Sequence, residues 1–442
     1  MDSNVYRPGA GKVPPLLVGR DQLVRDWTLQ LHAVGAGGGR AAAEDLLLTG
    51  PRGVGKTCTL TVLTDQARSL GYEVINLQAV RDEPTLVASL VRQADAAIAD
   101  ERGPWKRTKK AFERFAGFQL GAGGFSAGVN LHPPAGGPTG AARDPESLAG
   151  ALAALARAVR EEAGGRQAAA GATSGTTHGA THGDSGGVML TIDEIQVGDA
   201  REIALIAAVL HRLNVDHPDA AVVFAGTGLP HTMTRLTEAG VTHPDRLFVE
   251  TRIPLQLEEP DARLAILEPA RLAGGGWEPA ALRAVLEASN RYPAHLQYFA
   301  QAAWRHAPGP VVDLDSAEAA IPPAAEQLTM RTLEPRWDAL SGREAELVAA
   351  IAANGGRATA QELGVILGRE QRSWSRVRQN LIETGDIYAP RRGVLEITMP
   401  ALARYALHEY PDLQGRSGER LVSLAEMRRR SSHNPPHLEG TA

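Results

Sequence analysis

Residues 50–57, Gly-Pro-Arg-Gly-Val-Gly-Lys-Thr, have the types and spacing that suit phosphate binding. They match the P-loop pattern, in which a glycine is followed after four residues by Gly-Lys-Thr or Gly-Lys-Ser. The glycines permit close backbone approach to an anion, and the N-terminus of the following helix favours negative charge. We expect Lys56 to reach the β- and γ-phosphates of a nucleotide and the Thr57 hydroxyl to hold Mg²⁺. The residues expected around the nucleotide are Gly50, Pro51, Arg52, Gly53, Val54, Gly55, Lys56, Thr57 and Cys58.

An acidic pair, Asp193 and Glu194, follows the apolar run 188–192. In an open α/β sheet, ligands bind at the carboxyl ends of the strands, so a strand that ends in two acids brings both to the phosphate site. Asp193 is expected to coordinate Mg²⁺, directly or through water. Glu194 is expected to act as the general base that orients and polarises the attacking water. Read without the P-loop, the same pair would be two acids that cap a helix.

A third polar position, Thr227, follows the next apolar run, 221–225, within Gly226-Thr227-Gly228. Thr227 would lie beside the γ-phosphate and could hydrogen-bond the attacking water. A plain Gly-x-Gly turn explains the segment equally well. The guanine-selecting pattern Asn-Lys-x-Asp does not occur in the sequence, so a GTPase is disfavoured and ATP is the expected nucleotide.

The elements that must position these residues alternate between strand and helix from residue 46 to about residue 253. Apolar runs at 46–48, 72–77, 188–192 and 221–225 predict strands buried on both faces, and residues 56–70 and 84–99 predict helices. This alternation predicts an α/β fold, a three-layer P-loop NTPase core with a parallel sheet between helices.

Length, composition and net charge limit the class of protein to which the chain can belong. A chain of 442 residues predicts two or three domains, and 43% hydrophobic with 22% charged residues is typical of a soluble globular protein. The net charge of −5 provides no global basic field for nucleic acid. The single cysteine, Cys58, excludes an intramolecular disulfide and reads as a small buried residue. The sequence has no apolar signal core and no run of 18 apolar residues, so we expect no membrane partner and a cytoplasmic location.

We expect the domains to be a flexible N-terminus at 1–15, a core at 16–257, a helical lid at 258–335, a winged helix at 336–410 and a disordered tail at 411–442. Within the core, residues 118–131 are glycine-rich, and residues 163–186 are of low complexity and predict a disordered insertion. His178 and His182 lie in that insertion with no cysteine and a single acid, Asp184, nearby in the sequence, which argues against a metal site.

The C-terminal region reads as three helices, near 343–353, 359–367 and 373–384, followed by strands that begin at 385 and 394. This pattern predicts a winged helix, whose third helix commonly enters the DNA major groove. Residues 369–392 hold six arginines and three acids, a local charge of +3. Such modules also dock proteins, so both partners stay open. The candidate DNA contacts are Arg372, Arg376, Gln379, Arg391 and Arg392.

Taken together, these motifs resemble the AAA+ ATPases, specifically bacterial ATP-binding proteins related to the origin-recognition and initiator ATPases. The resemblance covers residues 14–410, and it is the combination of motifs that is specific. The segments that carry it are Leu17-Val18-Gly19-Arg20-Asp21, the P-loop, Asp193-Glu194-Ile195-Gln196, Gly226-Thr227-Gly228 and Asp245-Arg246-Leu247-Phe248.

The resemblance implies several roles. Arg20 belongs to the box that lies against the nucleotide, and Thr227 matches the sensor-1 position. Arg246 matches the arginine that reaches the γ-phosphate of a neighbouring subunit, which implies a homo-oligomer; a surface arginine is the alternative. Arg291 stands where close relatives carry glycine in Gly-Tyr-Pro, so a nucleotide contact by Arg291 stays open. The resemblance thus implies a Mg²⁺-dependent, slow or partner-stimulated ATP hydrolase acting as a DNA-binding switch. The alternative is a signalling or scaffold protein of the STAND type, whose winged helix docks protein.

Overall fold

The computed structural model describes residues 5–9, 11–80, 85–97, 108–109, 112, 144–173 and 186–413. It divides into two compact units, which we name the sheet unit and the helical unit. The sheet unit comprises Gly9–Gly50 and Gly55–Pro254, and the helical unit comprises Met1–Pro8, Pro51–Val54 and Leu255–Ala442. The glycine-rich stretch 118–131, His178, His182 and the tail from residue 414 lie outside the described residues.

The sheet unit is built on a five-stranded sheet in the order β2-β3-β4-β1-β5, and each adjacent pair of strands is parallel. The four strands predicted from apolar runs are present as β1 to β4, and both ends of each lie within three residues of the predicted limits. The fifth strand, β5, was not predicted from an apolar run. The strands are β1 (Asp45–Thr49), β2 (Tyr72–Gln78), β3 (Gly187–Asp193), β4 (Val222–Gly228) and β5 (Phe248–Arg252). β1, β3 and β4 are almost wholly buried, which explains why their sequences are continuous apolar runs.

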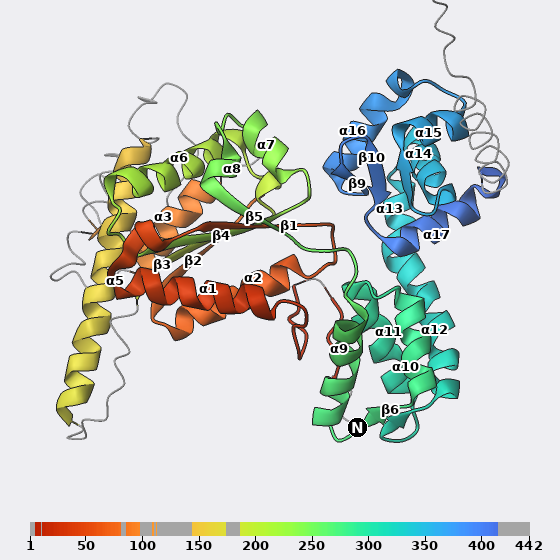
Figure 1. Cartoon of the computed structure of the whole chain (residues 1–442), viewed down its shortest axis with the longest axis horizontal. Helices are drawn as coiled ribbons and strands as arrows, with labels where there is room; N and C mark the ends of the chain where they lie inside the picture. Colours follow the sequence, from red (N-terminus) through yellow and green to blue (C-terminus); the bar gives the residue numbers. More distant parts are fainter. Residues whose placement is uncertain are drawn as a thin grey trace, which may run out of the picture. The chain divides into compact units, whose positions relative to one another are not determined.

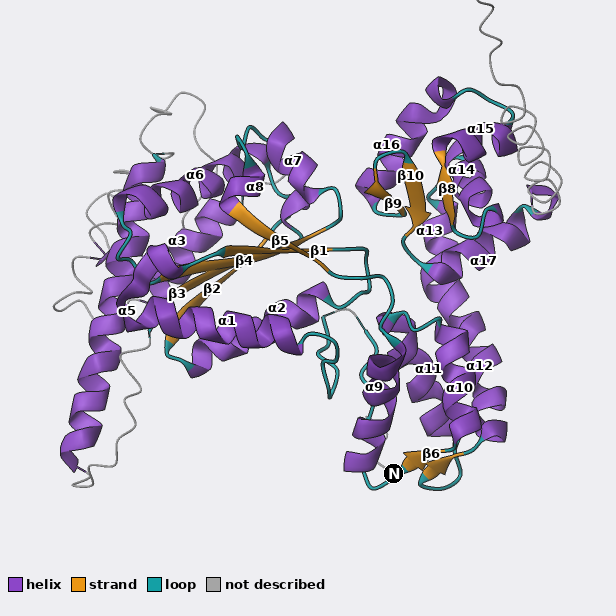
Figure 2. Ribbon diagram, viewed as in Figure 1, coloured by secondary structure: helices purple, strands orange, loops and turns teal. Residues whose placement is uncertain are grey.

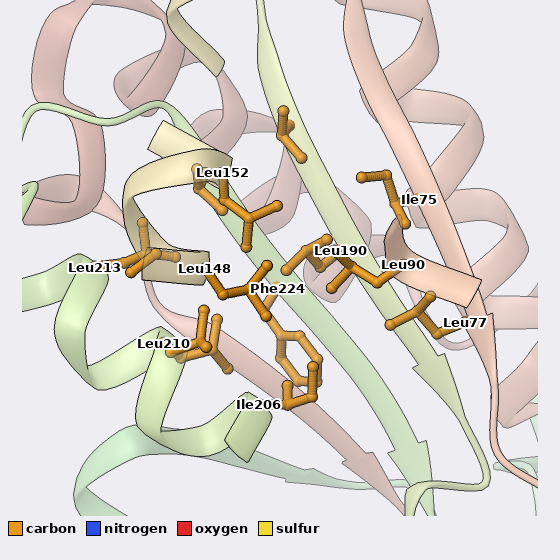
Figure 3. Packing of buried hydrophobic residues seen from close by; sticks show 14 of the residues in the cluster. Ile75, Leu77, Leu90, Leu148, Leu152, Leu190, Ile206, Leu210, Leu213 and Phe224 are labelled. Carbon is orange, nitrogen blue, oxygen red and sulfur yellow. The ribbon is translucent and has the colours of Figure 1, made fainter. Parts of the chain in front are cut away.

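Helices cover both faces of this sheet (Figure 1). α1 (Asp21–Ala33) and α2 (Lys56–Ser69) lie on one face, and α3 (Leu86–Ala97), α5 (Pro145–Thr173) and α6 (Ala200–Asp216) lie on the other. Figure 3 shows the packing on the second face, where Leu148 and Leu152 of α5 meet Leu190 and Phe224 of the central strands. The three-layer α/β arrangement expected from the alternating pattern is therefore present.

Helix α5, yellow in Figure 1, corrects the predicted start of the low-complexity insertion. Residues 163–173, expected to be disordered, continue the helix to Thr173. Alanine is the strongest helix former, and extending an existing helix needs no new nucleus, so an alanine-rich segment after a stable helix stays helical. Residues 174–185 of the predicted insertion lie outside the described residues.

A buried ion pair holds the start of β1. Arg40 Nη1 and Nη2 donate to the two carboxylate oxygens of Asp45 at 2.8 and 2.5 Å, and each side chain is 1% exposed. Arg40 lies in the short helix η2 (Gly39–Ala42), directly before the strand. Its Nε donates to Asn214 Oδ1 of α6 at 2.7 Å, and Nη1 donates to the Val222 carbonyl of β4 at 3.1 Å. Through these bonds Arg40 joins η2 to β1, α6 and β4.

Four helices lie within residues 258–335, where a helical lid was predicted: α9 (Glu259–Leu272), α10 (Pro279–Ser289), α11 (Pro293–His306) and α12 (Leu314–Leu328). Short parallel strands β6 (Gly276–Trp277) and β7 (Val311–Val312) pair beside them. The N-terminus was predicted to be loose, but Tyr6 is 1% exposed. Its hydroxyl donates to the Ile266 carbonyl and accepts from Trp277 Nε1, both at 2.7 Å. The aromatic ring, rather than the Gly/Pro content of the segment, thus decides its placement.

The C-terminal part contains the three predicted helices, α14 (Gly342–Ala353), α15 (Ala360–Leu367) and α16 (Ser375–Thr384), and the two predicted strands, β9 (Ile387–Arg391) and β10 (Val394–Ile397) (Figure 2). A strand that the sequence did not predict, β8 (Arg357–Thr359), completes an antiparallel sheet in the order β8-β10-β9. Thr359 and Glu362 form a capping box at the start of α15. The remaining elements are η5 (Thr329–Leu333), α13 (Glu334–Asp338), η6 (Gln371–Trp374) and α17 (Pro400–Glu409).

Candidate nucleotide-binding and catalytic site

The P-loop connects β1 to α2, as the sequence predicted. The Gly50 N–H donates to the Gly228 carbonyl of β4 at 3.2 Å, and Lys56 Nζ donates to the Gly50 carbonyl at 3.0 Å. Gly53 and Gly55 have φ angles of +73° and +93°, which L side chains rarely adopt. The loop conformation therefore depends on both glycines, and Lys56, 5% exposed, is buried at the start of the helix.

Two hydroxyls converge on the carboxylate of Asp193 at the end of β3. Thr57 Oγ1, from the first turn of α2, lies 3.2 and 3.1 Å from the two carboxylate oxygens. Thr227 Oγ1, from β4, donates to Asp193 Oδ1. Because β4 lies between β1 and β3 in the sheet, Thr227 is positioned between the P-loop strand and the acidic strand. The structure thus brings together Thr57, Asp193 and Thr227, as expected for one site.

Glu194 lies next to this group in a left-handed backbone conformation, with φ 55° and ψ 46°. Its N–H donates to Thr227 Oγ1 at 3.0 Å, which holds the strained residue in place. Its carboxylate Oε1 lies 3.9 Å from Lys56 Nζ, and its Oε2 accepts a 2.6 Å hydrogen bond from Gln196 Nε2. The sequence analysis included Gln196 in the segment Asp193-Glu194-Ile195-Gln196 but gave its side chain no role.

The oxygens gathered here suit Mg²⁺ better than a transition metal. Among the described residues, no group of three or more His, Cys, Asp and Glu side chains could hold a metal ion. Magnesium is commonly held by one or two carboxylates together with nucleotide phosphates, rather than by an all-protein cage. Asp193 and the Thr57 hydroxyl supply hard oxygen atoms of that kind. The residues present therefore fit a magnesium ion bound with a nucleotide.

Two further residues that were predicted to lie around the nucleotide, Cys58 and Arg20, have local partners. Cys58 is half-buried rather than fully buried as predicted, and its Sγ lies 3.1 Å from the Lys12 carbonyl. Burial, and then the negative charge of Asp193, raise the pKa of the Cys58 thiol. Arg20 is 8% exposed, directly before α1, and donates from Nη1 to the Gly19 carbonyl at 2.7 Å.

Two other arginines, Arg246 and Arg291, were considered as nucleotide contacts from the sequence. Arg246 is exposed on the short helix α8 (Pro244–Leu247), just before β5. Arg291 has a φ of 53°, the left-handed conformation that suits the glycine of close relatives. In the helical unit, to which residues 51–54 belong, Tyr292 rather than Arg291 contacts the loop. Its hydroxyl donates to the Arg52 carbonyl at 2.5 Å.

The predicted DNA contacts are surface residues, with one change in their local structure. Arg372 lies in η6, so it precedes α16 instead of sharing a continuous helix with Arg376. Arg372, Arg376, Arg391 and Arg392 are exposed, and none of them forms an ion pair within the described chain. Gln379 is half-buried and donates to Glu383 Oε1 at 3.1 Å.

Comparison with known proteins agrees with this geometry. Residues 16–223 match the model of the AAA ATPase domain, and residues 331–406 match a domain of unknown function (DUF8462). No curated protein sequence matches significantly. The Walker-type ATPase PABY2304 of Pyrococcus abyssi superposes with a TM-score of 0.52 at 15% identity, covering 88% of this chain and 96% of that one. Cdc6p from Pyrobaculum aerophilum, at 13% identity, covers 95% and 99% of the two chains with a TM-score of 0.43.

The match of residues 16–223 to the AAA ATPase domain agrees with the P-loop of the sheet unit. The core of that unit is the predicted α/β sheet with helices on both faces. Among the described residues, no helix has the length and apolar character needed to cross a membrane.

Proposed function

We propose that the chain is an ATP-binding and ATP-hydrolysing switch. The observation that carries the proposal is the convergence of Thr57 and Thr227 on Asp193, with Glu194 fixed beside them and Lys56 within 3.9 Å of Glu194. A phosphate-binding loop, two hard metal ligands and a second carboxylate are the parts that P-loop hydrolysis needs.

In this proposal the P-loop backbone and Lys56 bind the β- and γ-phosphates of ATP. Lys56 Nζ donates to the Gly50 carbonyl at the start of the loop, which holds the ammonium group beside the residues proposed to bind the phosphates. Asp193 and Thr57 hold Mg²⁺, which neutralises charge on the phosphates when it is bound. Glu194 accepts a proton from the attacking water, and Thr227 orients that water.

We further propose that residues 336–410 form a winged helix that binds DNA. Three helices with an antiparallel sheet, and four exposed arginines on η6, α16, the end of β9 and the turn after it, support this assignment. Arginines of this kind bind the phosphate backbone, which gives salt-sensitive affinity without sequence preference. The exposed Arg246 is proposed to reach the nucleotide of a neighbouring copy, so ATP would favour a homo-oligomer.

One observation favours the alternative, a STAND-type scaffold whose winged helix docks protein. Within the helical unit, Arg404 Nη2 of α17 lies 3.4 Å from the Ala288 carbonyl of α10. A module packed in this way could be released by nucleotide exchange.

The two proposals differ in the effect of the exposed arginines on DNA affinity. Arg372→Ala/Arg376→Ala and Arg391→Ala/Arg392→Ala variants are expected to lose at least tenfold in affinity for a fluorescent duplex at low salt. A matched control, Arg271→Ala/Arg283→Ala, removes two exposed arginines from α9 and α10 and should bind normally. Equal affinity in all three variants would reject the DNA site and favour the scaffold. Molar mass measured with ATP, with ADP and with DNA tests the oligomer.

A further inference from the structure

Gln196 connects the proposed general base to the segment that follows β4. Its Nε2 donates to Glu194 Oε2 at 2.6 Å, and its side chain lies in η4 (Ile195–Val197), directly after the acidic pair. A carboxylate only accepts hydrogen bonds, so the amide nitrogen of Gln196 must face Glu194 and the amide oxygen must face away. With 7% of the residue exposed, Gln196 has little freedom to turn.

The amide oxygen of Gln196 is held from the opposite side. It accepts from the Leu229 N–H at 3.2 Å and lies 3.4 Å from Thr232 Oγ1. Both groups belong to the turn into α7 (Thr232–Glu238), and Thr232 donates its single hydroxyl proton to the Leu229 carbonyl at 2.6 Å. Leu229 and Thr232 are 1% and 0% exposed, so this anchor is rigid and shielded from water.

Gly228 provides an independent indication that the anchor is tightly packed. A Cβ at this position would lie 2.1 Å from Thr232 Oγ1 and 2.9 Å from Gln196 Oε1. Both separations are shorter than real Cβ contacts, so only glycine leaves room for the amide and the hydroxyl. The predicted Gly-x-Gly turn therefore has a second purpose beyond presenting Thr227.

We propose that Gln196 is a positioning residue that sets the orientation of the Glu194 carboxylate for proton transfer. The proposal rests on the proposed role of Glu194 as general base. The amide is neutral, so it fixes Oε2 without donating a full charge, and it leaves Oε1 available to a water. Orienting partners of a reacting side chain contribute to rate by reducing misalignment in the transition state. The same bonds couple Glu194 to α7, so a displacement of that helix would turn the base.

The test compares Gln196→Ala, Gln196→Met and Gln196→Glu in the full-length protein by single-turnover ATP hydrolysis. The Ala and Met variants are expected to lose about 10- to 100-fold in rate, as other orienting partners do, with ATP affinity unchanged. Gln196→Met retains the side-chain volume, so it keeps the test informative if the Ala variant is unstable. In Gln196→Glu, the new carboxylate cannot donate a hydrogen bond to Glu194 Oε2, so the rate should fall at least as far as in the Met variant.

Two further variants separate positioning from a general structural effect. Gly228→Ala should reproduce the rate loss, because its Cβ meets Thr232 and Gln196 without touching Glu194. Thr237→Val removes an exposed α7 hydroxyl that bonds only within its helix, to the Met233 carbonyl at 3.1 Å, and should hydrolyse ATP normally.

The outcomes distinguish this proposal from the proposed function. If Gln196 acts through Glu194, Gln196→Ala has no further effect in a Glu194→Gln background. An unchanged or faster rate in both Gln196→Ala and Gln196→Met would overturn the positioning role. A further loss in the Glu194→Gln background would also overturn it. Normal turnover by Glu194→Gln alone would instead reject the proposed base, and the positioning role with it.

Discussion

The hydroxyl of Thr227 donates a hydrogen bond to the carboxylate of Asp193, and this bond joins two neighbouring strands at the candidate site. The same carboxylate accepts from Thr57 on α2, so a single acid is shared by β3, β4 and the helix behind the P-loop. Polar side chains converge at the carboxyl ends of three strands because the strands are parallel and adjacent.

Replacing Thr57 by alanine is expected to remove the magnesium dependence of ATP binding. The hydroxyl is one of the two protein oxygens that fit the ion, and Asp193 alone would hold it weakly. Isothermal titration with and without Mg²⁺ measures the effect. Thr61→Ala is the matched control, because Thr61 lies one turn further along α2 and bonds only to the Thr57 carbonyl, at 2.9 Å. A Thr57→Ala variant with full magnesium dependence would contradict the assignment.

Replacing Thr227 by valine should preserve ATP binding and lower turnover by about tenfold or more, as expected when a group that acts mainly in the transition state is lost. Valine keeps the shape of the side chain but removes both the donor to Asp193 and the acceptor of the Glu194 N–H. Steady-state hydrolysis and nucleotide affinity, measured on the same preparation, separate the two effects. Weaker ATP binding with an unchanged rate would assign Thr227 to binding rather than to catalysis.

The buried Arg40–Asp45 pair should be far more important for stability than an exposed pair of the same type. Arg40→Ala leaves Asp45 buried without its partner, which is expected to lower the free energy of unfolding by about 3–5 kcal/mol. The control is Arg68→Ala, whose pair with Asp65 is 50% and 63% exposed. Exposed pairs contribute about 0–1 kcal/mol. Denaturant unfolding of both variants provides the comparison, and similar losses would show that the buried pair is not a stabilising contact.

His295 should make the stability of the helical unit depend on pH. Burial, together with the positive charge of Arg404, lowers the pKa of His295 from 6.5 to about 4. The imidazole packs edge-on against the ring of Tyr292, with 4.5 Å between the ring centroids. Its Nδ1 has no hydrogen-bond partner among the described residues. Between these two pKa values the unfolded chain binds the proton and the native chain does not.

The contribution of neutral His295 to the free energy of unfolding is therefore fully present above about pH 6.5. It is lost as the pH falls toward about 4, by up to about 3 kcal/mol. His295→Phe cannot bind the proton, so it should reduce the slope of unfolding free energy against pH in that window. Denaturant unfolding at a series of pH values measures the slope. An unchanged slope in the variant would mean that other groups cause the acid sensitivity.

Much of the sheet unit could be predicted from the sequence because its signals are local. Buried parallel strands are continuous apolar runs, and the P-loop carries its own spacing. Asp193 and Thr227 were found because each ends such a run. The order of the strands is a tertiary property, so the insertion of β4 between β1 and β3 had no signal in the periodicity.

The contacts that sequence reasoning missed depend on chain segments far apart or on residues of ordinary type. Arg40 reaches Asn214 across the sheet unit, and Tyr6 reaches Trp277 across the helical unit. Gln196 and Gly228 each belong to a segment noted in the sequence, but their proximity depends on the packing of β3 against β4. The strand β8 is only three residues long, too short for a period to be recognised.

The most direct test of the central claim compares ATP binding and hydrolysis by Glu194→Gln and Lys56→Ala with those of the unmodified chain. Glutamine keeps the shape of Glu194 but cannot accept a proton, so this variant should bind ATP with normal affinity and hydrolyse it at least about 100-fold more slowly, the scale of a lost general base. Lys56→Ala should fail to bind ATP. Normal hydrolysis by Glu194→Gln, or normal ATP binding by Lys56→Ala, would contradict the account.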